Sequence, residues 1–140
     1  MKRSKLCRYP MDDREILLAD RDSEVRRQVA EVFRKDGYKV ETTDSAIHVL
    51  CTVLEKKIPV VLLGTDFDKK MNLPEMVRLL KHCNRQLTII LLSDEESLPL
   101  VRTLRQEGIF YHALKPADRF DTEEIRLAVE CAFKRPESSN

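Results

Sequence analysis

Val60-Val61-Leu62-Leu63-Gly64-Thr65-Asp66 is the most strand-like stretch of the chain. Its four consecutive apolar residues lack the alternation of a half-buried strand and predict a strand that is covered on both faces. The polar residues that follow predict the end of this strand and a loop. A strand of this kind belongs to a parallel sheet with helices on both sides.

The same pattern extends outward from this strand in both directions. Further apolar runs predict strands at residues 16–19, 38–42, 87–92 and 109–114. Amphipathic stretches predict helices at about residues 23–36, 74–83, 99–107 and 122–134, and one more between Asp44 and Pro59. This alternation predicts a doubly wound α/β fold with a five-stranded parallel sheet.

Three of the predicted helices have a clear apolar stripe at helical spacing, which we expect to face the core. In the first helix the stripe is Val25, Val29, Val32 and Phe33. In the second helix, which Asp44 would cap, the stripe is Ile47, Leu50, Cys51 and Leu54. In the last helix, which Asp121 would cap, it is Ile125, Ala128, Val129, Ala132 and Phe133. Gly37 and Gly108 are expected to end the first and fourth helices.

Length and composition indicate one cytoplasmic domain. The chain has 140 residues, 42% of them hydrophobic, which is enough for one core. Its 25 basic and 24 acidic residues leave a net charge of +1, which argues against nucleic acid as a partner. No apolar stretch has the length of a signal peptide core or a membrane span. We expect a flexible extension at residues 1–14, the domain at 15–135 and a flexible tail at 136–140.

The cysteines and histidines give no metal motif. The residues concerned are Cys7, Cys51, Cys83, Cys131, His48, His82 and His112. None of these side chains has the close spacing of a zinc or dithiol site. We therefore expect reduced cysteines and no bound metal.

Functional residues of an open parallel sheet lie just after the carboxyl ends of its strands. Here these positions hold Asp20, Gly64, Ser93 and the pair Lys115-Pro116. With this set, residues 15–135 resemble the receiver domain of bacterial response regulators. The resemblance implies a flavodoxin-like sheet with the strand order 2-1-3-4-5 and a role in two-component signal transduction.

The resemblance also implies a phosphorylation pocket. In that family, two acidic residues after the first strand hold magnesium, and an aspartate at the end of the third strand accepts a phosphoryl group. A hydroxyl and a lysine bind the phosphoryl oxygens. Asp20 matches the first acid, Ser93 the hydroxyl and Lys115 the lysine, and Pro116 stands where the family often has a cis bond.

Two positions depart from the family pattern. Arg21 replaces the second acid, and Gly64 replaces the phosphoacceptor aspartate. Asp20, Arg21 and Lys115 sum to one positive charge, so magnesium should bind weakly or not at all. We therefore expect a pseudo-receiver without ordinary phosphorylation and without enzymatic activity, in which an ion pair between Asp20 and Lys115 fills the pocket.

Two alternatives stay open at this point. Asp66 lies two residues after Gly64 and would point to the same side if the strand continued, which would make it a substitute phosphoacceptor. Alternatively, Lys115, Arg21 and the Ser93 hydroxyl could bind phosphate or a nucleotide phosphate. No glycine-rich phosphate loop supports nucleotide binding.

A receiver without phosphorylation can still bind proteins. In the family, the fourth helix, the fifth strand and the fifth helix form the usual output surface. Leu127 and Cys131 lie opposite the buried stripe of the last helix and predict a small exposed apolar patch, unless Leu127 is one scattered surface leucine. His112 stands where the family commonly has an aromatic residue. We expect a signalling protein as partner, such as a histidine kinase or a regulator, or a homodimer through this surface.

Overall fold

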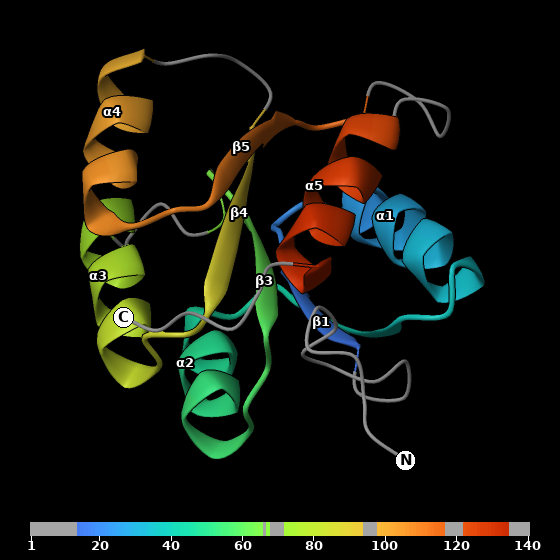
Figure 1. Ribbon diagram of the computed structural model, residues 1–140, viewed down its shortest axis with the longest axis horizontal. Helices are drawn as coiled ribbons and strands as arrows, with labels where there is room; N and C mark the ends of the chain where they lie inside the picture. Colours follow the sequence, from blue (N-terminus) through green and yellow to red (C-terminus); the bar gives the residue numbers. More distant parts are fainter. Residues whose placement is uncertain (1–13, 66, 68–71, 94–97, 117–121, 135–140) are drawn as a thin grey trace.

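The computed structural model describes residues 14–65, 67, 72–93, 98–116 and 122–134. Five parallel strands form one sheet in the order β2-β1-β3-β4-β5 (Figure 1). The strands are β1 (Glu15–Ala19), β2 (Lys39–Thr43), β3 (Val60–Gly64), β4 (Thr88–Ser93) and β5 (Tyr111–Leu114). The helices are α1 (Ser23–Lys35), α2 (Ala46–Glu55), α3 (Leu73–Cys83), α4 (Leu98–Glu107) and α5 (Glu123–Lys134). The predicted flavodoxin-like fold is confirmed.

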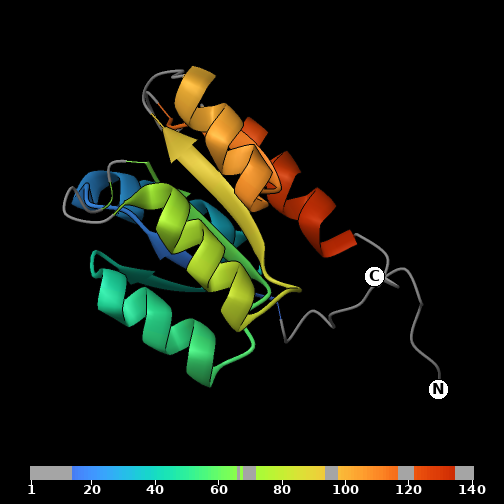
Figure 2. The ribbon, with the colours of Figure 1, turned by 90° about the vertical axis from the view of Figure 1, so that its left-hand side faces the viewer.

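Helices cover both faces of this sheet, as Figures 1 and 2 show. One core lies under α1 and α5 and includes Ile16, Leu18, Val60, Leu62, Ile90 and Leu92. The other lies under α2, α3 and α4 and includes Leu17, Ala19, Val61, Leu63, Ile89 and Leu91. Alternate residues of each central strand therefore face opposite cores, which explains why these strands are apolar throughout.

α1 begins at a capping residue, and α1 and α4 end where the sequence predicted. Asp22 caps α1, because its side chain accepts hydrogen bonds from the amides of Glu24 and Val25. Gly37 and Gly108 have φ angles of 93° and 108°, a backbone conformation that residues with a Cβ rarely adopt. They stand just after α1 and α4, where the sequence predicted the helices to end.

The prediction for the buried face of α2 was wrong. Ala46, Val49, Thr52 and Val53 are the buried residues of this helix. Ile47 is 74% exposed and Leu54 is 67% exposed. The helix has two apolar faces, and the sequence pattern favoured the one with the larger side chains, whereas contact with the sheet selected the other. Ser45, not Asp44, caps this helix.

The boundaries of the domain can be checked only in part. Residues 1–13 and 135–140, in the predicted extension and tail, lie outside the described residues, as does the predicted cap Asp121. Arg14 was assigned to the extension, but its guanidinium lies 5.7 Å from the ring centroid of Tyr38 and 5.9 Å from that of Phe133. None of the described helices has the length and apolar character needed to cross a membrane.

Candidate functional site

The carboxyl ends of the strands bring the predicted pocket residues to one edge of the sheet. Gly64 is the last residue of β3 and Ser93 the last of β4, while Asp20 and Lys115 directly follow β1 and β5. The parallel register aligns these ends, because Ala19 lies beside Leu63. Asp66, the alternative phosphoacceptor, lies outside the described residues.

A buried ion pair occupies the centre of this edge. Lys115 Nζ lies 3.2 Å from Asp20 Oδ2 and 3.4 Å from Oδ1. Both side chains are almost fully buried, with exposed fractions of 4% and 0%. The amide of Asp22 also donates a hydrogen bond of 2.9 Å to Asp20 Oδ1. The predicted pairing of Asp20 with Lys115 is therefore present.

Gly64 makes room for this arrangement. A Cβ atom added to Gly64 would lie 2.5 Å from Oδ2 and 2.9 Å from Cγ of Asp20, closer than real Cβ contacts. The backbone at Gly64 has no positive φ, so the glycine is required by the neighbouring carboxylate and not by a turn. The Asp20 carboxylate thus lies in the space that a side chain at position 64 would enter.

Arg21 is exposed, and a second arginine near the pocket, Arg26, was not predicted. Arg21, which we counted in the pocket charge, has an exposed side chain. Arg26 was missed: its Nη1 donates hydrogen bonds of 2.6 Å to the carbonyl of Asp20 and 3.2 Å to that of Arg21. Arg26 follows Asp20 by six residues and lies near the start of α1, and this short separation was the signal in the sequence that the two could be in contact. Arg26 holds the loop between β1 and α1 in place.

Ser93 connects the pocket to β5. Its Oγ lies 2.6 Å from Nε2 of His112, and the amide of Lys115 donates a 2.8 Å hydrogen bond to the carbonyl of Ser93. Ser93 is buried, whereas His112 is half-buried. The bond between Lys115 and Pro116 is trans, unlike the cis bond that the resemblance suggested. A side-chain contact therefore connects the buried Ser93 with a half-buried side chain on β5.

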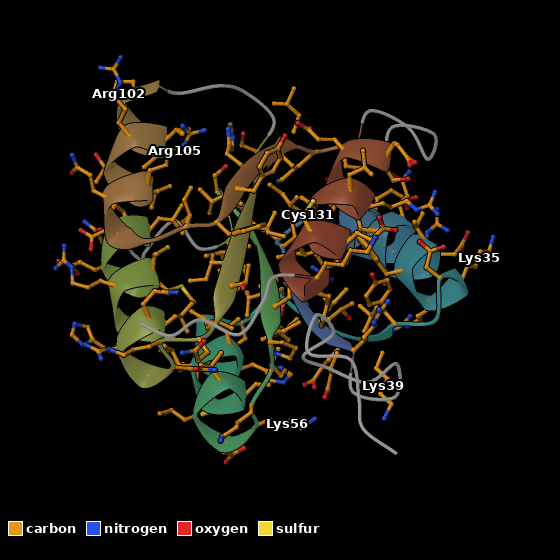
Figure 3. The ribbon with its side chains drawn as sticks, viewed as in Figure 1. Lys35, Lys39, Lys56, Arg102, Arg105 and Cys131 are labelled. Carbon is orange, nitrogen blue, oxygen red and sulfur yellow. The ribbon has the colours of Figure 1, made fainter. Side chains whose placement is uncertain are left out.

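The outer surface beside β5 contains the predicted apolar patch. Leu127 is 54% exposed, and Cys131, labelled on α5 in Figure 3, is also exposed. They help to line a surface pocket of about 280 Å³ with Phe110, Tyr111, Glu124 and Ala128. At its rim the Tyr111 hydroxyl donates a 2.9 Å hydrogen bond to Glu124, an interaction that raises the pKa of Tyr111. The two predicted residues thus belong to one concave apolar surface.

The strand order and the residues at the strand ends define a single receiver-type α/β domain. A family model described as the response regulator receiver domain matches residues 16–130. The chain belongs to this family and thereby to two-component signal transduction.

Comparisons with individual proteins agree with this assignment. The chain is 27% identical over 120 residues to sporulation initiation phosphotransferase F of Bacillus subtilis (strain 168), covering 86% of this chain and 94% of the relative. A CheY-like receiver domain protein from Methanospirillum hungatei JF-1 has a TM-score of 0.73 at 18% identity, covering 85% and 95% of the two chains. The beryllofluoride-activated NtrC4 receiver domain, a dimer in solution, has a TM-score of 0.77 at 16% identity, covering 86% and 97%. The two structures share the fold with this chain.

Proposed function

We propose that this protein is a cytoplasmic receiver domain that signals by binding other proteins, without aspartyl phosphorylation and without catalysis. One observation carries the proposal: the Asp20 carboxylate lies against Gly64 and pairs with buried Lys115. In the family, the lysine faces the phosphoacceptor. Here a carboxylate from another strand already neutralises it.

The donor set does not suit magnesium or a phosphoryl group. Magnesium binds through carboxylate oxygens, and a phosphoryl group needs a carboxylate oxygen at the end of β3. Gly64 and Arg21 have no carboxylate oxygen to offer, and the carboxylate of Asp20 forms an ion pair with Lys115. Among the residues that the structure describes, no three His, Cys, Asp or Glu side chains form a cluster that could hold a metal ion.

The surface that supports partner binding is the concave apolar region on β5 and α5. Leu127 and Cys131 line it, and its other lining residues also come from β5, α5 and the residue before β5. His112, the third residue predicted for this surface, is not among the lining residues and contacts Ser93 instead. An exposed apolar surface with a polar rim is typical of a protein interaction site. We propose a signalling protein, a histidine kinase or another regulator, as its occupant; a second copy of the chain is the alternative.

The test is intact-mass analysis after incubation with acetyl phosphate and magnesium. The wild type should gain no phosphoryl mass, and Asp66→Ala should behave identically. A double variant, Arg21→Asp with Gly64→Asp, restores the acidic set and serves as the positive control for the donor. A wild-type gain that disappears in Asp66→Ala would establish Asp66 as the acceptor and overturn the proposal. A gain that persists would place the group elsewhere and overturn it as well.

Anion binding is tested separately. Inorganic phosphate and ATP should leave the thermal unfolding temperature unchanged, because Lys115 is buried and paired and Arg21 is exposed. A concentration-dependent rise that Lys115→Met abolishes would instead favour an anion sensor.

A further inference from the structure

The outer face of α2 carries a largely exposed apolar stripe. Ile47, Cys51 and Leu54 are exposed, and Leu50 beside them is half-buried. At 3.6 residues per turn these four side chains form a stripe about 100° wide, the width of a face that usually packs against another element. Figure 2 shows α2 at one end of the layer formed by α2, α3 and α4, with α4 at the other end. The stripe is therefore accessible to another molecule.

The stripe is symmetric about its own midpoint. That midpoint lies between Leu50 and Cys51, and Ile47 and Leu54 are equally far from it in opposite directions. Asp44 and Lys57 are also equally far from this midpoint. Both are exposed, they carry opposite charges, and they flank the two ends of the helix.

Asp44 and Lys57 are available to a partner. Neither has an ion-pair partner within the described part of the chain. Two neighbouring side chains are already engaged: His48 Nε2 lies 2.6 Å from Glu41, and Lys56 lies 3.3 Å from the same carboxylate and 3.5 Å from Glu15. Glu55, the last residue of α2, is also exposed, but its symmetric position holds Ala46, so it meets no charge of the second copy. The charges at the two ends are thus free to determine how another helix would align.

We propose that a second copy of this chain docks on α2, with the two α2 helices antiparallel across a two-fold axis. Ile47 then packs against Leu54 of the second copy, and Leu50 and Cys51 each lie beside their own counterparts next to the axis. Asp44 of each copy faces Lys57 of the other. A two-fold interface requires one surface to be complementary to itself, and this sequence satisfies that condition with apolar pairs at the centre and opposite charges at the ends. Antiparallel helix dipoles are also favourable.

Size and position set the properties of this dimer. α2 has ten residues, so two copies bury less than the roughly 1,200 Å² typical of a stable complex. The dimer should therefore be weak and depend on concentration. The surface on β5 and α5 lies at the other edge of the sheet from β2, so a dimer through α2 leaves it open for a signalling partner.

Sedimentation equilibrium over a concentration series tests the proposal. The wild type should show a reversible monomer–dimer equilibrium, and Ile47→Glu with Leu54→Glu should abolish it; both positions are exposed, so the fold should survive, which circular dichroism checks. Asp44→Lys and Lys57→Asp should each raise the dissociation constant roughly fivefold by creating like-charge contacts. The double charge exchange should restore the wild-type value. Only an antiparallel pairing of α2 with itself predicts this rescue.

Single-cysteine variants identify the face that self-associates. Cys51 lies next to the proposed axis, and at an interhelical distance of about 8–10 Å its Cα is within disulfide range of its counterpart. A chain retaining only Cys51 should form a covalent dimer under mild oxidation, whereas one retaining only Cys131, which is also exposed, should not. A covalent dimer through Cys131 but not through Cys51 would overturn the proposal. So would a wild type that stays monomeric in the sedimentation series, or a dimer that the α2 substitutions do not weaken.

Discussion

Asp20 and Gly64 lie so close together that a Cβ on the glycine would stand 2.5 Å from Oδ2 of the aspartate. The two residues belong to neighbouring parallel strands or follow them directly, and Lys115 holds the carboxylate from a third. A receiver pocket normally directs several carboxylates at one lysine. Here Asp20 places its carboxylate beside the buried Lys115, in the space left by the missing side chain of Gly64.

Gly64→Ala should destabilise the protein although alanine is small. The added Cβ forces the Asp20 carboxylate to move from its present contact with Lys115. Overpacking of this kind costs about 1–3 kcal/mol in the free energy of unfolding. Urea denaturation measures the change. Equal stability of the wild type and the variant would show that Asp20 relocates freely.

Lys115→Met should destabilise the protein more than Gly64→Ala does. We expect a total loss of about 3–5 kcal/mol in the free energy of unfolding, because the substitution leaves a buried carboxylate without its cation. A second substitution, Asp20→Asn, removes that charge. The double variant should therefore lose less stability than Lys115→Met alone, as measured in the same urea series. Additive losses would contradict a direct interaction between the two side chains.

Ser93→Ala should alter His112, which lies on the adjacent strand. Losing the 2.6 Å contact between Oγ and Nε2 should cost about 1 kcal/mol of stability and change the environment of the imidazole. Nitrogen-15 NMR of the histidine ring reports its tautomer and its titration directly. Unchanged ring signals would mean that the two residues are not coupled in solution.

The contact of Glu41 on β2 with His48 on α2 should contribute less to stability as the pH becomes acidic. Burial alone would raise the pKa of Glu41, but its hydrogen bonds to His48 and Lys56 outweigh burial and lower the pKa. A carboxylate with a lowered folded-state pKa contributes stability above its unfolded pKa of about 4.3, and that contribution is lost as the pH falls through the folded value. Glu41→Gln should therefore flatten the decline of stability in this range, which urea denaturation at several pH values measures.

Leu127→Glu should weaken the binding of signalling partners, because it places a charge in the apolar surface on β5 and α5. Leu79→Glu is the matched control, since Leu79 is 47% exposed but lies on α3. Affinity capture with wild type and both variants, followed by mass spectrometry, should show partners lost only with Leu127→Glu. Equal losses in both variants would indicate nonspecific adhesion.

Local patterns in the sequence were sufficient for the fold and for much of the site. Unbroken apolar runs predicted the buried strands, and the last helix buries all five residues of its predicted stripe. The predicted strand ends placed Asp20, Gly64, Ser93 and Lys115 together at one edge of the sheet, as the structure has them. Such features are local, because burial on both faces and helical periodicity are written in consecutive residues.

Contacts between distant residues were decided by the tertiary structure alone. The sequence of α2 contains two apolar faces, and only the sheet beneath it selects Val49 and Val53 for the core and leaves Ile47 and Leu54 outside. Likewise, only the fold brings the guanidinium of Arg26 to the Asp20 carbonyl and the imidazole of His112 to Ser93. A side chain's direction depends on neighbours that the fold brings in from elsewhere in the chain. The sequence therefore identified which residues form the pocket, while the packing of the strands determined that a carboxylate from one strand fills the space beside the glycine of another.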